Sequence, residues 1–164
     1  AFLLLAFWGF EKTILKLKNI FGRINLASAA LILVFGVSFI STALFMIQAH
    51  PYEQLYFNRL AGKNLSEIQD RFDMDYWGLA YRSGLEFISL DKSPVIKYVS
   101  ETSPGSYTFI LPQEDAKRLN WIENEQEASY LITNYRWKKS YPSYQEVYSV
   151  QVEGVKILSV FKLK

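Results

Sequence analysis

The chain has 164 residues, of which 50% are hydrophobic and 16% aromatic, and its formal net charge is +2. It contains no cysteine, which excludes a disulfide scaffold, a thiol nucleophile and a cysteine-based zinc site. His50 is the single histidine, so a Ser-His-Asp triad would depend on one residue beside an apolar run.

The first ten residues, Ala1 to Phe10, are almost entirely apolar and begin without a methionine. This piece is too short to cross a bilayer, so we expect it to be the end of a truncated membrane helix. The chain is then expected to be the C-terminal fragment of a longer membrane protein. Residues 11–23 carry Lys12, Lys16, Lys18 and Arg23 against one glutamate, and we interpret them as a basic cytoplasmic loop.

From Ile24 to Tyr52 the sequence contains no charged residue. A hydrocarbon core of about 30 Å needs about 20 apolar residues in a helix, so residues 24–50 are predicted to form a transmembrane helix. A buried core helix is the alternative, but such helices are rarely apolar on every face over this length. A cleaved signal peptide fits less well, because its apolar region is shorter.

Flanking charges predict the orientation of this span. Residues 1–50 hold four basic and one acidic side chain (+3), whereas residues 51–164 hold 14 basic and 15 acidic ones (−1). Only Arg59 and Lys63 are basic in the first residues after the span. The positive-inside rule therefore places residues 51–164 outside the cytoplasm. A nearly neutral outer domain argues against nucleic acid as a partner.

The segment just after the span permits two interpretations. His50-Pro51 is a natural helix stop, and the aromatic residues that follow suit the membrane interface. The same segment could instead face a substrate cavity, where aromatic faces and hydrogen-bonding groups hold a sugar. The interface interpretation concerns Tyr52, Tyr56 and Phe57, and the cavity interpretation concerns Tyr52, Glu53, Tyr56 and Asn58.

Residues 72–90 are predicted to form an amphipathic helix. Apolar positions recur at spacings of three and four, at Trp77, Tyr81, Gly84, Leu85 and Ile88. Asp75 stands where a helix N-cap is expected, and capping outweighs a catalytic role for it. Arg82 is one turn before Glu86, so a surface ion pair is expected, with a lipid phosphate as the other possible partner.

The remaining chain predicts short strands and turns. Strands are expected at residues 94–100, 106–111 and 128–137, and a short helix at residues 113–119. A closing β-hairpin is expected from residues 146–152 and 155–163 around Glu153-Gly154, and residues 140–144 are expected to form a loop. The predicted fold class is therefore one or more membrane helices followed by a small mixed α/β extracytoplasmic domain, residues 51–164, that ends in a β-hairpin.

Two segments carry a family resemblance. The sequence HPYEQLYFNRLAG from His50, followed by FDMDYWGLAYRSGLEFI from Phe72, resembles the C-terminal region of bacterial polytopic glycosyltransferases of family 39, or protein-mannosyltransferase-like type. The resemblance covers residues 48–88 well and the remainder loosely. Lys63 stands after Gly62 where the family pattern has a second glycine.

This resemblance implies a GT-C type membrane enzyme, a multi-pass protein of the bacterial inner membrane, that transfers a sugar from a polyprenyl-phosphate carrier on the extracytoplasmic side. In that family the catalytic acidic residues lie on an early extracytoplasmic loop, so no catalytic residue is expected in this chain. Glu53, Asp73 and Asp75 are accordingly not assigned as a general base. No cofactor and no metal ligand are expected in the fragment, and metal dependence of the whole enzyme is left open.

The outer domain is expected to cover the substrate cavity and to help select the acceptor. Its expected partners are membrane lipid, the polyprenyl-phosphate-linked sugar and upstream helices of the same protein. The candidate cavity residues are His50, Tyr52, Glu53, Tyr56, Asn58, Asp75, Tyr76, Trp77 and Arg82.

The sequence also permits two other functions. The first is a membrane-tethered interaction or glycan-binding module without a catalytic role, which would suit the aromatic-rich domain. The second is a purely structural domain that stabilises a bundle of membrane helices.

Overall fold

A computed structural model describes residues 2–21, 26–58 and 60–164 of the chain. The chain divides into two compact units, Ala1–Gln48 and Ala49–Lys164, which are described separately below. Arg23, Ile24 and Arg59, which entered the predictions of the basic loop, the span and its flanking charges, lie outside the described residues.

The N-terminal unit consists of two helices, α1 (Phe2–Phe21) and α2 (Leu26–Ala49). The stretch expected to be a loop from residue 11 is helical as far as Phe21. Neither proline nor glycine interrupts it after Gly9, and leucine and lysine are strong helix formers. The rings of Phe10 and Phe35 meet edge to face with centroids 4.8 Å apart, so the two helices contact each other.

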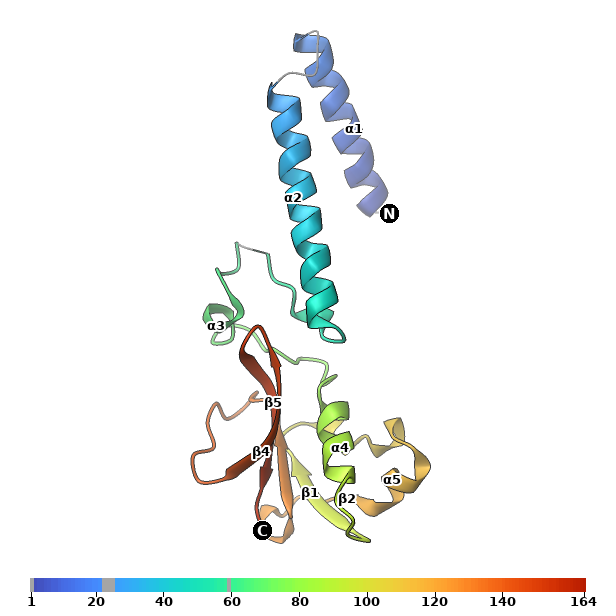
Figure 1. The fold of residues 1–164 in the computed structure, drawn as a ribbon, viewed down its shortest axis with the longest axis vertical. Coiled ribbons are helices and arrows are strands. Elements are labelled where there is room, and N and C mark those ends of the chain that lie inside the picture. Colours follow the sequence, from blue (N-terminus) through green and yellow to red (C-terminus); the bar gives the residue numbers. More distant parts are fainter. Residues whose placement is uncertain (1, 22–25, 59) are drawn as a thin grey trace. The chain divides into compact units, whose positions relative to one another are not determined.

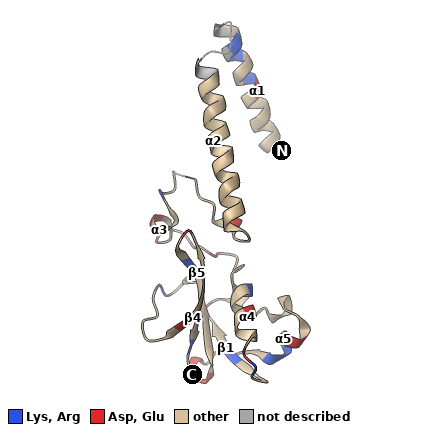
Figure 2. Cartoon of the chain, viewed as in Figure 1, with Lys and Arg blue, Asp and Glu red and all other residues tan. Residues whose placement is uncertain are grey.

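The sequence of helix α2 contains no charged residue, and the described part of the helix is tan in Figure 2. Ala29–Ala49, with a mean hydropathy of 2.5, is long and apolar enough to cross a membrane, and apart from Ala49 at its end no residue of it is buried within the structure. Among the described residues it is the one helix with that length and composition.

The C-terminal unit is built on a five-stranded mixed sheet with the order β2-β1-β3-β5-β4 (Figure 1). Strand β1 is parallel to β2 and β3, whereas β5 is antiparallel to β3 and β4. This confirms a small mixed α/β domain that ends in a β-hairpin. The strands are β1 (Ile96–Ser100), β2 (Leu119–Trp121), β3 (Tyr130–Thr133), β4 (Gln145–Val152) and β5 (Val155–Lys162).

Short helices complete this unit. The α-helices are α3 (Leu65–Ile68), α4 (Tyr81–Ser89) and α5 (Gln113–Arg118), and the 3₁₀ turns are η1 (Glu53–Leu55), η2 (Ser103–Ser106), η3 (Thr108–Ile110) and η4 (Glu125–Glu127). Helix α4 packs on β3, β4 and β5. Gly84 makes this packing close, because a Cβ atom there would lie 3.1 Å from methyl carbons of Ile132 and Leu158.

The amphipathic helix is shorter than predicted. Tyr81, Gly84, Leu85 and Ile88 are buried as expected, but the helix begins at Tyr81 rather than near Phe72. Trp77 therefore does not belong to its apolar face and is 72% exposed. The physical reason is a turn in the preceding residues, where the chain adopts a left-handed conformation at Gly78 (φ 70°).

Residues 106–111, predicted as a strand, instead form 3₁₀ turns. Phe109 is 77% exposed and the ring of Tyr107 lies 5.4 Å from it, so this apolar run has no sheet to bury it. By contrast, the strands predicted around Val99 and Ile132, the short helix and the closing hairpin are all present.

Both faces of β5 are buried along most of the strand. Helix α4 covers the side of Leu158 and Val160, while Phe161 packs beneath the rings of Tyr141 and Tyr144 on the other side. Lys156 and Lys162 lie only at the strand ends. The loop after β3 therefore acts as a second cover for the sheet.

Candidate functional site

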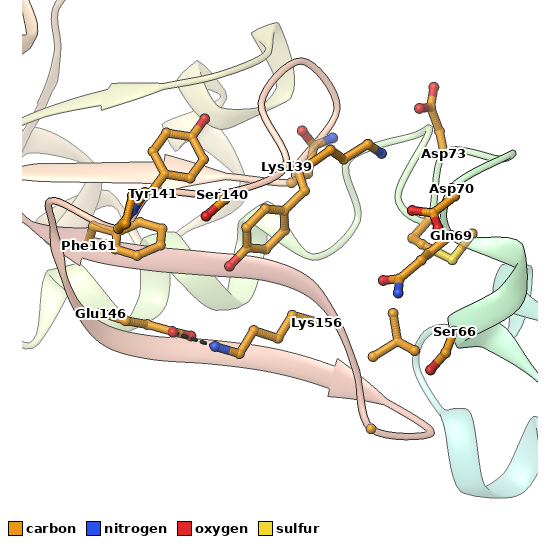
Figure 3. A pocket seen from close by; sticks show the side chains of 16 residues that line it. Ser66, Gln69, Asp70, Asp73, Lys139, Ser140, Tyr141, Glu146, Lys156 and Phe161 are labelled. Carbon is orange, nitrogen blue, oxygen red and sulfur yellow. Dashed lines mark hydrogen bonds and ion pairs between the residues drawn. The ribbon is translucent and has the colours of Figure 1, made fainter.

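The C-terminal unit contains a cavity of about 570 Å³ (Figure 3). Three segments form its wall: the chain around α3, the loop after β3, and the β4–β5 hairpin. Its lining residues are Ser66, Gln69, Asp70, Asp73, Met74, Asn134, Tyr135, Lys139, Ser140, Tyr141, Pro142, Glu146, Gly154, Val155, Lys156 and Phe161. A cavity of this size holds a small molecule such as one or two sugar rings.

A single carboxylate holds the loop after β3 in place. Glu101, just beyond the end of β1, accepts hydrogen bonds from the backbone N–H groups of Arg136 (3.2 Å), Trp137 (2.7 Å) and Lys138 (2.8 Å), and from the Thr133 hydroxyl. β1 and β3 are parallel, so both strands end at the same edge of the sheet, which is why Glu101 can reach this loop. Tyr135 takes up a left-handed conformation (φ 59°) as the loop turns.

A chain of hydrogen bonds runs along the hairpin wall. The Tyr135 hydroxyl donates to Ser159 Oγ (2.6 Å), which in turn donates to Glu146 Oε1 (3.0 Å). Lys156 Nζ donates to the other oxygen of Glu146, and Figure 3 shows these two side chains pointing toward each other. Ser159 is fully buried, so its hydrogen bonds fix the side chains of Tyr135 and Glu146 in the wall of the cavity.

These surroundings shift the pKa values of Glu146, Lys156 and Tyr135. Burial pushes the pKa of Glu146 up, but hydrogen bonds from Lys156 and Ser159 more than offset this, so the pKa lies below its ordinary value. The hydrogen bond to Glu146 raises the pKa of Lys156. Burial raises the pKa of Tyr135. At neutral pH the wall therefore presents an ionised Glu146–Lys156 pair beside a neutral phenol.

Replacing Glu146 with glutamine is expected to make the free energy of unfolding depend less on pH in the acid range. Because the folded-state pKa of Glu146 lies below its unfolded value, its stabilisation is present above the unfolded pKa and is lost as the pH falls through the folded pKa. We expect the variant to lose about 1 kcal/mol of unfolding free energy near neutral pH and almost nothing in strong acid. Urea unfolding across the acid range would measure this, and an equal loss at every pH would contradict it. Glu123→Gln, at an exposed glutamate, is the control.

The rest of the cavity wall also carries polar and charged side chains. Asp70 and Lys139 are exposed at the rim, and Gln69 projects from the end of α3 (Figure 3). Asp73 forms an ion pair with Arg136, with Oδ2 and Nε 3.3 Å apart. Hydroxyl-rich ligands need such a mixture of carboxylate, amide and ammonium groups, which together supply both acceptors and donors.

Aromatic rings complete the lining. Tyr141 lies with its centroid 5.2 Å from that of Phe161 and 6.2 Å from that of Tyr135, and Lys138 Nζ sits 4.6 Å from the Tyr141 ring centre. Ring faces of this kind pack against the C–H groups of a ligand. Among the described residues, no group of three or more histidine, aspartate or glutamate side chains is placed to hold a metal ion.

The candidate residues just after the span lie outside this cavity. His50 Nδ1 meets Glu53 Oε1 across an exposed turn, and this hydrogen bond lowers the pKa of Glu53. Tyr52 is buried, with its hydroxyl 2.8 Å from Ser83 Oγ in the first turn of α4. Tyr56 is 38% exposed, and Asn58 Oδ1 accepts from a nearby backbone N–H group in its own loop.

The second group of candidates is divided among different places. Asp75 is 1% exposed, and its carboxylate accepts hydrogen bonds from the backbone N–H groups of Leu79 (2.8 Å) and Ala80 (3.1 Å). It therefore supplies the acceptor for two N–H groups just before α4. Burial raises the pKa of Asp75 despite these bonds. Arg82 pairs with Glu86 as predicted, at 2.8 Å on an exposed face.

Tyr76 and Trp77 lie side by side, with ring centroids 5.1 Å apart. Tyr76 also lines a second, smaller hollow of about 390 Å³ next to the main cavity. Its other lining residues are Phe57, Gln69, Asp70, Arg71, Phe72, Asp73 and Lys139. None of the nine candidate residues lines the larger cavity.

The residues that do line it carried only weak signals in the sequence. Tyr141 belongs to the Ser140–Tyr144 stretch, whose prediction as a loop was correct. Glu146 and Lys156 flank the predicted hairpin turn, but their approach depends on a register that includes irregularities in β4. Asp70 and Asp73 sit in a polar segment without periodicity, and only the fold brings them opposite the hairpin.

Comparison with known proteins adds no relative. No family model, no curated protein and no solved structure matches this chain.

Proposed function

We propose that this chain is the C-terminal part of an integral-membrane glycosyltransferase that uses a polyprenyl-phosphate sugar donor. In this proposal α2 spans the inner membrane of a bacterium, and residues 49–164 form an extracytoplasmic domain that binds the hydroxyl-bearing acceptor. The observation that carries it is the cavity of about 570 Å³, which combines aromatic rings with carboxylate, amide and ammonium groups.

The lining suits a carbohydrate for a simple chemical reason. A sugar ring has an apolar face of C–H groups and a rim of hydroxyls that both donate and accept hydrogen bonds. Tyr141 and Phe161 offer ring surface, while Asp70, Glu146 and Lys139 offer hydrogen-bonding partners. The same groups would hold an acceptor in a fixed orientation.

The resemblance in residues 48–88 supports the transferase class. Several of the motif residues have structural roles here: Asp75 serves the backbone before α4, and Gly78 turns against Pro104. These roles are compatible with a domain that supplies acceptor binding, while a carboxylate on an upstream extracytoplasmic loop acts as the general base.

The proposal can be tested with the full-length enzyme in membranes. Asp70→Asn and Lys139→Ala alter exposed cavity residues that carry little of the fold. We expect each to raise the KM for the acceptor about tenfold, because each removes one polar contact of about 1.4 kcal/mol, and to leave kcat nearly unchanged. Glu123→Gln is the matched control. Transfer from radiolabelled polyprenyl-phosphate sugars would be measured at equal protein levels.

Two outcomes would count against the proposal in different ways. Unchanged acceptor KM in both variants would remove the cavity from acceptor binding. Binding of methyl glycosides that is lost in the variants, without any transfer by the full-length protein, would instead favour a membrane-tethered glycan-binding module.

A further inference from the structure

A cluster of exposed aromatic rings lies outside the cavity, and we call it the aromatic rim: Tyr76, Trp77 and Trp137. These side chains are 56%, 72% and 74% exposed. The Arg136 guanidinium joins them, with its carbon 4.8 Å from the Tyr76 ring centre and 5.4 Å from that of Trp137. Large rings left in water are costly, so a cluster of them calls for a partner.

The aromatic rim is held in place by the fold. Glu101 accepts from the backbone N–H of Trp137 (2.7 Å), and Asp73 holds Arg136. Beside Trp77, Gly78 presses on Pro104 so closely that a Cβ atom at Gly78 would lie 2.5 Å from that of Pro104. The rings are thus presented by anchored loops rather than by free ends, which lowers the entropy cost of binding a partner.

Within the C-terminal unit, the aromatic rim lies at the end where the chain enters from α2. Ala49, the last residue of α2, belongs to this unit and is 5% exposed. Three residues later Tyr52 bonds to Ser83 in the first turn of α4. The residues just before that turn are held by Asp75, which directly precedes Tyr76 and Trp77.

We propose that the aromatic rim lies in the headgroup region of the bilayer that α2 spans. Tryptophan and tyrosine favour this region, because their rings are apolar and their N–H or O–H groups stay hydrated. Arg136 contacts the rings of Tyr76 and Trp137 and would meet a lipid phosphate at that depth. The tether at Ala49 keeps the domain at a membrane surface, so even weak contacts become intramolecular.

This inference depends on α2 being a membrane span but not on the transferase activity. It assigns the exposed Tyr76 and Trp77 to lipid rather than to a sugar. A carbohydrate or a protein partner for the same rings would leave them away from lipid, and the experiment below separates these cases.

The test uses the full chain, reconstituted in vesicles of phosphatidylethanolamine and phosphatidylglycerol. The chain has four tryptophans, so single reporters are made by changing the others to phenylalanine. One protein keeps only Trp77 and another only Trp137. The control lacks all four and carries Leu90→Trp, at a site that is 75% exposed and lies at the opposite end of α4.

Lipids brominated near the top of the acyl chains quench tryptophans that lie at the interface. We expect the Trp77 and Trp137 reporters to be quenched at least about twofold more than the reporter at position 90. Circular dichroism checks that all three proteins are folded. Equal quenching at the three sites in protein that floats with vesicles would overturn the proposal while leaving α2 as a span. Failure of the chain to float with vesicles would overturn both.

Discussion

Replacing Glu101 with alanine is expected to lower the free energy of unfolding by about 2 kcal/mol and to loosen the loop that follows β3. Three backbone N–H groups and the Thr133 hydroxyl converge on this carboxylate, and its loss leaves them to compete for water. Hydrogen exchange at the amides of Arg136, Trp137 and Lys138 should rise about tenfold or more. Mass spectrometry of exchanged peptides would measure it.

The matched control for this experiment is Glu123→Ala, at an exposed glutamate two residues after the end of β2. It should change neither stability nor exchange. The loop that Glu101 holds carries both Tyr135 and Lys139 of the cavity and Trp137 of the aromatic rim. Glu101→Ala should therefore also weaken glycoside binding and Trp137 quenching together; exchange that stays at the level of the unmodified protein would show that other contacts fix the loop.

Replacing Asp75 with alanine is expected to cost about 2–4 kcal/mol of stability. The carboxylate is 1% exposed and accepts from Leu79 and Ala80, the second of which is fully buried. Without it, two backbone N–H groups lose their acceptor, and at the buried Ala80 water cannot replace it. Urea unfolding followed by circular dichroism of the full chain in detergent would measure the loss.

The asparagine variant separates a structural from a catalytic role for Asp75. Its side-chain oxygen can accept from one of the two N–H groups, but its amide nitrogen cannot replace the other oxygen. We expect a loss of about half the size of that in the alanine variant, and Asp70→Ala, at an exposed aspartate, should have almost no effect. Unchanged stability with loss of sugar transfer would contradict the structural role.

The position of Asp75 shows where local patterns stop being sufficient. Its sequence context predicted a cap, and the structure does use it for backbone N–H groups, but in a turn that precedes a helix starting at Tyr81. Helical periodicity extended the prediction back to Phe72, because Trp77 is spaced correctly from Tyr81. The left-handed turn at Gly78 and its contact with Pro104 interrupt that periodicity, and Pro104 is 26 residues further along the chain.

The strand predicted at residues 106–111 failed for a related reason. An apolar run becomes a strand only where a sheet edge can receive it, and the neighbours of β1 are β2 and β3. Phe109 and Tyr107 are left on the surface in consequence. The closing hairpin succeeded because its two halves are adjacent in sequence, so its pairing required no distant partner.

Two features of this protein follow from local sequence: the uncharged helix α2 and the hairpin of β4 and β5. Each reflects a pattern that repeats within one continuous segment, and a short range of residues is enough to establish it. The cavity and the aromatic rim are different, because each is assembled from loops that are far apart in the chain. Asp70 and Lys156 line one cavity, and Tyr76 meets Arg136, only in the folded domain, where the segment before α4, the loop after β3 and the β4–β5 hairpin come together.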